Sequence, residues 1–277
     1  MRIWAISDIH VDFRENAEWV SALSDDEFRQ DVCLLAGDVS HQFDMLTQTL
    51  VQLRRKFYRL FFVPGNHDLW IRGEHWEHSV EKFEAILQFC RENAIDTQPA
   101  LIEVQGKSVC LYPVFSWYHQ PPQENSLYLP KPGEDPTNRM WSDSYFVRWP
   151  ATDFDPTEYF IRRSNSPVSF LEADLVLTFS HFLPRQEIMF SGPMVYDPER
   201  MKKYDRFPQF NFSRVAGSWQ IDRFIRRMGA KIHVYGHQHI NRDRVIDGVR
   251  YIAHCLGYPE ERRRGTVQGA RGLRQVL

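Results

Sequence analysis

Five short segments of the sequence concentrate side chains that bind metal ions: Asp8-Ile9-His10, Gly37-Asp38, Gly65-Asn66-His67-Asp68, His181 and Gly236-His237-Gln238-His239. In extended chain, residues i and i+2 face the same side, so both side chains of the first segment can reach one cation. The third segment places an amide, an imidazole and a carboxylate on one turn, and such a four-residue match is rare by chance. The last segment offers two imidazoles beside a flexible glycine. The pattern indicates a metal site.

The donor atoms of these segments narrow the kind of metal. Seven side chains offer oxygen or nitrogen: Asp8, His10, Asp38, Asn66, His181, His237 and His239. Mixed nitrogen and oxygen donors without sulfur suit Mn, Fe or Zn. Seven donors are more than one tetrahedral site uses. They suffice for two ions if the carboxylate of Asp38 bridges them.

Four of the five segments immediately follow predicted strands. Apolar runs predict strands over residues 2–6, 32–36, 58–63, 174–179 and 231–235, and amphipathic patterns predict helices over 15–23, 43–56, 74–93 and 219–228. Two hairpins are expected, at Gly106-Lys107 and at Asp247-Gly248. The β-α-β order predicts an α/β domain with a largely parallel sheet. Ligands of such sheets gather at the carboxyl ends of the strands.

Two regions lack this periodicity, residues 116–167 and the shorter segment 185–215. Residues 116–167 are rich in proline and aromatic residues, and we expect them to be a lid-like insertion in a single domain spanning 1–261. The aromatic residues of this insertion form either a small satellite core or a wall that stacks a flat leaving group. Residues 262–277 hold five arginines and no acid, which predicts a basic, flexible tail.

Composition excludes several classes of protein. Hydrophobic residues make up 43% and charged residues 25%, as in an ordinary soluble globular protein. The net charge of −2 gives no electrostatic case for a nucleic-acid or membrane surface. No apolar run approaches the roughly 18 residues that span a bilayer, and the N-terminus lacks a signal peptide's pattern. Four dispersed cysteines without a C-x-x-C pair are typical of reduced core thiols, so we expect a cytoplasmic protein.

The ordered series D-x-H, G-D, G-N-H-D, H and G-H-x-H, from Asp8 to His239, resembles the calcineurin-like metallophosphoesterase superfamily. The resemblance implies a four-layer α/β/β/α sandwich with a dinuclear metal centre at the strand ends. It implies that one metal is held by Asp8, His10 and His239, and the other by Asn66, His181 and His237, with Asp38 between them. It implies that His67 is a non-ligand histidine near the leaving group and that Asp68 steers its imidazole.

The implied reaction is hydrolysis of a phosphomonoester or phosphodiester of a small molecule. Two ions roughly 3.5–4 Å apart lower the pKa of a bridging water, and the hydroxide attacks phosphorus in line. His67 donates a proton to the leaving oxygen. Candidate substrate contacts are His41, three residues after the bridging aspartate, and Trp117, Tyr118 and His119 at the start of the insertion. The sequence leaves the substrate and the oligomeric state open.

Alternatives are a phosphoprotein phosphatase or nuclease of the same superfamily, and a metal-binding scaffold without turnover. One departure bears on the first alternative. The chain continues Val39-Ser40-His41-Gln42-Phe43 after Gly37-Asp38, without the arginine that protein serine/threonine phosphatases place there. This departure argues against a protein phosphatase, and the lack of a basic stripe argues against a nuclease.

Overall fold

The computed structural model describes residues 1–165, 173–190, 207–267 and 272–277. Its strands form two sheets. The first sheet has four strands in the order β10-β1-β2-β3, and the second has six in the order β4-β5-β6-β7-β9-β8. The strand bounds are β1 Ile3–Ile6, β2 Val32–Leu35, β3 Arg59–Phe62, β4 Ala100–Val104, β5 Lys107–Pro113, β6 Leu175–Phe179, β7 Ile232–Tyr235, β8 Arg242–Ile246, β9 Val249–Ala253 and β10 Arg274–Gln275.

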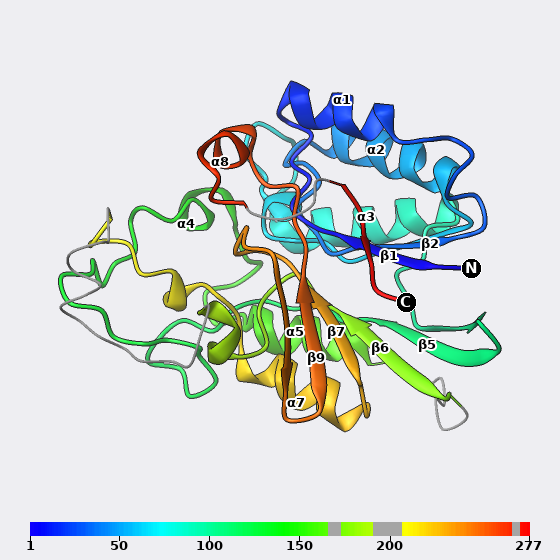
Figure 1. Cartoon of the computed structure of the whole chain (residues 1–277). Coiled ribbons are helices and arrows are strands. Elements are labelled where there is room, and N and C mark those ends of the chain that lie inside the picture. Colours follow the sequence, from blue (N-terminus) through cyan, green and yellow to red (C-terminus); the bar gives the residue numbers. More distant parts are fainter. Residues whose placement is uncertain (166–172, 191–206, 268–271) are drawn as a thin grey trace.

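Helices cover the outer faces of both sheets. Their bounds are α1 Arg14–Ala22, α2 Phe43–Lys56, α3 Ser79–Glu92, α4 Asp143–Phe146, α5 Pro156–Ser164, α7 Trp219–Arg227 and α8 Pro259–Arg264. In Figure 1, α1 and α2 lie on one side of the first sheet, and α5 and α7 lie beyond the second. One apolar cluster joins both sheets through fully buried strand residues such as Leu34, Phe61 and Leu177. The predicted four-layer α/β/β/α sandwich is confirmed.

Parallel pairing brings the carboxyl ends of several strands to one edge. β1 pairs in parallel with β2, and β2 with β3; in the second sheet β5, β6, β7 and β9 are parallel neighbours. The isolated parallel bridge between Ser7 and Cys255 joins the two sheets just past β1 and β9. The loops that follow these strands therefore meet, and they carry all five metal-binding segments.

The structure departs from the sequence prediction in two places. The third helix begins at Ser79 rather than residue 74, because the extended His78 caps it and its Nδ1 accepts the Glu81 N–H at 3.0 Å. The insertion at 116–167 contains the helices α4 and α5. The second of these follows an Asp155 cap whose carboxylate accepts the Glu158 N–H, a start signal present in the sequence.

The prediction of a flexible tail over 262–277 is wrong for its end. β10 pairs antiparallel with β1, and Val276 is buried with its N–H donated to Ile3 O at 2.8 Å. Two of the tail's arginines that the structure describes have partners on the body: Arg263 pairs with Glu15, and Arg274 with Asp243. The charges of these two arginines are therefore balanced within the fold.

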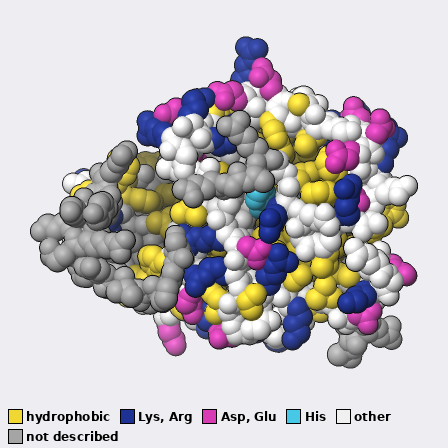
Figure 2. Space-filling view, viewed as in Figure 1, with side chains coloured by type: hydrophobic (Ala, Val, Ile, Leu, Met, Phe, Trp, Pro, Cys, Tyr) yellow, Lys and Arg dark blue, Asp and Glu magenta, His cyan; other side chains and the backbone are white. Residues whose placement is uncertain are grey.

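The surface carries both signs of charge. On the face seen in Figure 2, lysine and arginine side chains alternate with aspartate and glutamate among the described residues. All four cysteines are free thiols and are buried, as predicted. Across the described residues we find no helix with the length and apolar character that crossing a membrane requires.

Candidate metal centre

The predicted ligands turn toward one point because their backbone leaves the strands in an unusual conformation. Five of them have a positive φ: Asp8 50°, His10 39°, Asp38 57°, His237 74° and His239 54°. For a residue with a Cβ this region is disfavoured by about 1–2 kcal/mol. Such strain persists where the surrounding structure enforces it, and it gathers at functional sites. The strained backbone of these loops lowers the stability of the fold, and it directs the side chains toward one point.

One group of donors surrounds the end of β1. His10 Nε2 lies 3.0 Å from His239 Nε2, and His239 Nε2 lies 3.3 Å from Asp8 Oδ1. Asp38 Oδ2 is 3.8 Å from His10 Nε2. The ligand atoms of these four side chains all lie within 4.8 Å of one another, and a cation is a natural partner for them. We call Asp8, His10 and His239 the first half-site.

A second group lies on the other side of Asp38. Asn66 Oδ1 is 3.1 Å from both His181 Nε2 and His237 Nδ1, and His181 Nε2 is 3.5 Å from Asp38 Oδ1. All of these side chains are buried. We call Asn66, His181 and His237 the second half-site. Asp38 has one oxygen toward each half-site, so its position fits a carboxylate shared by two ions.

Three of the predicted histidine ligands have a hydrogen-bond partner on the ring nitrogen that faces away from the centre. His239 Nδ1 lies 2.7 Å from Glu261 Oε2. His181 Nδ1 lies 2.8 Å from Ala36 O, and His237 Nε2 lies 2.9 Å from Val215 O. These oxygens outside the centre favour the N–H at the outer nitrogen, and with a metal bound the inner nitrogen would offer its lone pair. Three histidines are thus prepared as ligands.

Two glycines of the motifs are needed because the centre is tight. A Cβ on Gly65 would lie 2.2 Å from Asp38 Oδ1, and a Cβ on Gly37 would lie 2.6 Å from His181 Nδ1. Gly37 also has φ +84°. Any other residue at these positions would displace ligand side chains, so the glycines belong to the site as much as the ligands do.

The electrostatics of the centre also fit a cation. Burial raises the pKa of Asp38 well above its usual range, and the carboxylates of Asp8 and Asp68 raise it further. Burial lowers the pKa of His239, but Asp8 and Glu261 outweigh it and bring the pKa to about 10. The nearby carboxylates thus stabilise a positive charge in the first half-site. Together with the prepared imidazoles, this donor set fits a pair of divalent ions.

His67 lies at the rim of the centre. Its Nε2 is 3.9 Å from Asp38 Oδ2, and its ring stacks on Trp70 at 3.7 Å. Burial, and then the neighbouring imidazoles of His239 and His181, lower the pKa of His67. This histidine lines the cavity above the ligands, where a substrate would sit.

Asp68 has a different role from the one predicted. Its two oxygens accept four backbone N–H groups, from Asp38, Val39, Ser40 and Gly65, at 2.8–3.1 Å. Among the described residues these backbone groups are its hydrogen-bond partners, so it does not steer the His67 ring. Burial raises the pKa of Asp68 to about 6, against the four N–H groups. Asp68 ties the loop after β2 to the loop after β3, and these loops carry Asp38 and Asn66.

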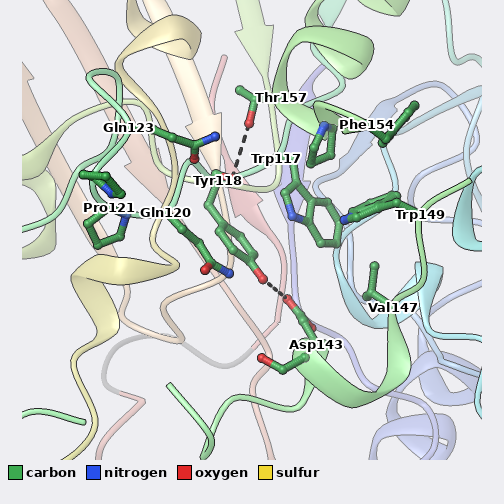
Figure 3. Close-up of a pocket in the computed structure, with 13 residues that line it drawn as sticks. Trp117, Tyr118, Gln120, Pro121, Gln123, Asp143, Val147, Trp149, Phe154 and Thr157 are labelled. Carbon is green, nitrogen blue, oxygen red and sulfur yellow. Dashed lines mark hydrogen bonds between the residues drawn. The ribbon is translucent and has the colours of Figure 1, made fainter. Parts of the chain in front are cut away.

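The four residues predicted to contact substrate lie at different places in the structure. Trp117 and Tyr118 line a cavity of about 560 Å³ beside the centre (Figure 3). His119 is buried, with Nδ1 3.1 Å from Ser218 Oγ. His41 Nδ1 lies 2.8 Å from Asp12 Oδ1, and its ring is 6.2 Å from that of Trp70. None of the four is among the described residues that line the cavity over the metal ligands.

A cavity of about 430 Å³ opens directly over the ligands. Asp38, Asn66, His237 and His239 form its floor, with His67 at one side. Aromatic and apolar residues line the rest of it: Trp70, Met140, Trp141, Phe207, Phe210, Phe212 and Tyr258. The Trp141 ring stacks on Phe210 at 5.7 Å and meets His237 edge-on at 5.6 Å. Trp141 of the insertion and Phe212 thus pack against His237 of the second half-site.

Two acidic residues that support the ligands were missed. Glu261, on α8, holds His239 and also accepts the Tyr258 N–H at 2.7 Å. Asp143, at the start of α4, accepts the Asn66 Nδ2–H at 2.9 Å. Both lie in segments without a strand–loop motif, and each is one acid among 36 in the chain. Sequence spacing carries no signal for such partners.

Comparison with known proteins places this geometry in a family. A family model described as calcineurin-like phosphoesterase matches residues 1–241. A curated relative, the acyl-carrier-protein phosphodiesterase PptH of Mycobacterium tuberculosis, is 26% identical over 99% of this chain and 83% of its own length. The crystal structure of phosphopantetheinyl hydrolase PptH from the same organism superposes with a TM-score of 0.76. That structure is 23% identical and is matched over 100% of this chain and 95% of its own.

Proposed function

The chain belongs to the calcineurin-like phosphoesterase family, and we propose that it is a phosphodiesterase that removes a phosphopantetheinyl group from an acyl carrier protein. Membership of the family makes the protein a metal-dependent hydrolase of phosphoric esters. The proposal adds the diester and the substrate. It is supported by the activity for which the relative is named and, independently, by the cavity over the predicted metal ligands.

The character of that cavity is the observation that carries the choice of a diester. Among the described residues that line it there is no lysine or arginine. A phosphomonoester dianion or an oligophosphate has negative charge beyond what lies between the metals, and sites for such groups supply further cations. A diester has one negative charge and two organic arms. The aromatic wall of Trp141, Phe210 and Phe212 suits a neutral arm.

We propose that Asp8, His10 and His239 hold one ion, that Asn66, His181 and His237 hold the other, and that Asp38 joins both. The donor set supports Mn, Fe or Zn. When bound, two such ions activate a water for attack and offset charge on the phosphoryl oxygens. The protein's part is to hold the ligand atoms converged and to keep three imidazoles in the tautomer that offers a lone pair inward.

His67 is proposed to assist the leaving group. It lines the cavity beside Asp38, and its stack on Trp70 fixes the plane of the ring. From this place an N–H of the ring can donate to an oxygen that leaves phosphorus. A positioned proton donor of this kind contributes about 10²–10⁴-fold to a rate.

The test uses the full chain loaded with Mn²⁺. A phosphopantetheinylated acyl carrier protein is incubated with it, and intact-protein mass spectrometry follows the loss of the phosphopantetheinyl group. The paired substrates bis(4-nitrophenyl) phosphate and 4-nitrophenyl phosphate separate diester from monoester activity. We expect release of the group from the carrier protein and a higher kcat/KM on the diester.

A higher kcat/KM on the monoester, with no change in the mass of the carrier protein, would refute the proposal and leave only the family assignment. Turnover of the diester without release from the carrier protein would retain the reaction and refute the substrate. The Asp38→Asn variant serves as the inactive control, because its side chain faces both half-sites.

A further inference from the structure

Asp143 is a buried carboxylate that the reaction described above does not use. It lies at the first position of α4, inside the 116–167 insertion, and is 3% exposed. Its Oδ1 accepts Asn66 Nδ2–H at 2.9 Å and Trp70 Nε1–H at 2.6 Å. Its Oδ2 accepts Trp141 Nε1–H at 2.8 Å and Tyr118 O–H at 3.1 Å. One side chain thus connects a predicted metal ligand to three aromatic residues around the site.

All four of these donors are neutral. Burying a carboxylate costs several kcal/mol unless hydrogen bonds or a cation compensate it, and burial accordingly raises the pKa of Asp143. A fold that needed only to close this corner could use an apolar residue at lower cost. The retained carboxylate indicates a task that needs an acceptor with two oxygens at this place.

The Asn66 amide defines that task. An asparagine presents an oxygen on one side and an NH₂ on the other, and only the oxygen can bind a cation. Here Oδ1 faces His181 Nε2 and His237 Nδ1, both at 3.1 Å. A flipped amide would place its NH₂ in the second half-site and repel a metal. The Asp143 oxygen holds Nδ2 on the outer side and so prevents that flip.

We propose that Asp143 is a positioning residue that orients the Asn66 amide for metal binding and couples the insertion to the second half-site. The coupling follows from its other oxygen. Trp141, held by that oxygen, meets His237 edge-on and forms the wall of the substrate cavity. Movement of this part of the insertion would pull the carboxylate, and with it the amide that faces the metal.

The shared carboxylate also links the two cavities. Asp143 and Tyr118 line the 560 Å³ cavity, and Figure 3 shows the Tyr118 hydroxyl reaching the Asp143 carboxylate there. Trp70, the third aromatic donor, stacks on His67. Because coupling between sites is reciprocal, metal at the second half-site should in turn fix the insertion.

The first experiment measures Mn²⁺ binding to the metal-stripped full chain by calorimetry, with the spin coupling of a Mn²⁺ pair read by electron paramagnetic resonance. In Asp143→Leu we expect the affinity for the second ion to fall about 10–100-fold, with loss of the coupled signal. Tyr118→Phe keeps the bond to Asn66 and should stay within about threefold of the parent. Asp222→Asn is the matched buried carboxylate, whose described partners are Tyr251, Arg226 and Arg185.

An exchange variant distinguishes positioning from simple packing. Asp143→Asn alone offers one oxygen for four donors, and we expect weaker binding of the second ion. In Asn66→Asp/Asp143→Asn the direction of the hydrogen bond is reversed, since the new amide donates to a carboxylate that needs no orientation. We expect the double variant to bind the second ion more tightly than Asp143→Asn alone.

Two results would overturn the proposal. One is a folded Asp143→Leu protein that binds both ions as the parent does. The other, which decides the matter if the leucine variant does not fold, is an exchange variant that binds no better than Asp143→Asn. Circular dichroism of each metal-stripped variant reports folding separately. None of these readouts depends on which phosphoester is the substrate.

Discussion

The two halves of the metal centre are supported by different kinds of partner. In the first half-site, the carboxylate of Asp8 is a proposed ligand, and the carboxylate of Glu261 accepts a hydrogen bond from His239. In the second half-site, the oxygen ligand is the neutral amide of Asn66, and backbone carbonyls back His181 and His237. The first half therefore carries more negative charge close to its metal position.

This difference predicts an order of binding. Carboxylate ligands and an ionised partner raise the affinity for a divalent cation, whereas neutral donors depend on preorganised geometry. We therefore expect the first Mn²⁺ to enter the half-site of Asp8, His10 and His239. The second half-site, roofed by Trp141 and tied to the insertion through Asp143, is expected to fill at a higher concentration.

The largest effect is expected where the halves meet. Asp38 lies 3.8 Å from His10 and 3.5 Å from His181, so Asp38→Asn removes the charge that both ions would share. We expect loss of both ions at micromolar Mn²⁺ and a fall in kcat/KM of more than about 10³-fold. Metal analysis after gel filtration measures the occupancy, with Asp31→Asn as a control at a buried carboxylate that binds Arg2. Retention of one ion at full affinity would show that the halves are independent.

A substitution of His67 tests whether the rim of the centre acts on the reaction without contributing to metal binding in either half-site. We expect His67→Ala to keep two ions and to lose about 10²–10⁴-fold in kcat for a diester with an alkoxide leaving group. The loss should be much smaller with a 4-nitrophenolate leaving group, which leaves without a proton. Kinetics on the two substrates and metal analysis together give the answer. Loss of metal in this variant would make His67 a ligand rather than a donor.

A substitution of Glu261 tests the first half-site alone. Glu261→Gln keeps the size of the side chain but weakens the acceptor for His239 Nδ1–H, and we expect the first ion to bind about 10–100-fold more weakly. The neighbouring Glu260, which pairs with Arg263 and Arg264 at the surface, gives a matched control in Glu260→Gln. Equal affinities of the two variants for the first ion would contradict the role of Glu261 as the hydrogen-bond partner that supports His239.

A substitution of Trp141 tests the cavity wall beside the second half-site. If its ring contacts a substrate arm, Trp141→Ala should raise KM for diesters with a flat or apolar arm by about 3- to 10-fold. Trp149→Ala is the comparison, because that indole packs edge-on against Trp117 and lines the other cavity. Steady-state kinetics with diesters of different arms make the measurement. The same KM for every arm in Trp141→Ala would assign the ring to packing alone.

The smallest effect concerns backbone strain. His237 has φ 74°, whereas His181 does not lie in the positive-φ region. In metal-free protein we expect His237→Gly to be about 1 kcal/mol more stable than His237→Ala. The order should reverse at residue 181, where His181→Gly is expected to be less stable than His181→Ala. Urea denaturation gives the free energies of unfolding, and the same order at both positions would remove the strain argument.

Sequence reasoning predicted the fold and the convergence of the ligands because both depend on local pattern. Each ligand follows an apolar strand within a short motif, and parallel strands bring their ends together. The role predicted for Asp68 was wrong. Its position next to His67 in the sequence suggested a contact with that ring, whereas its carboxylate accepts hydrogen bonds from four backbone N–H groups. Glu261 and Asp143 act from residues distant in sequence, so their roles depend on tertiary packing that spacing does not encode.

The pairing of β10 with β1 has a consequence for how the protein is made. β1 is translated before its edge partner β10 and before Glu261, which lie more than 200 residues further along the chain. Domains generally begin to fold from the N-terminal side during synthesis. A nascent chain that has reached residue 100 therefore displays Asp8, His10, Asp38 and Asn66 without their histidine partners. Such a chain lacks three of the seven proposed ligands, so metal binding by the full set has to follow translation of His239.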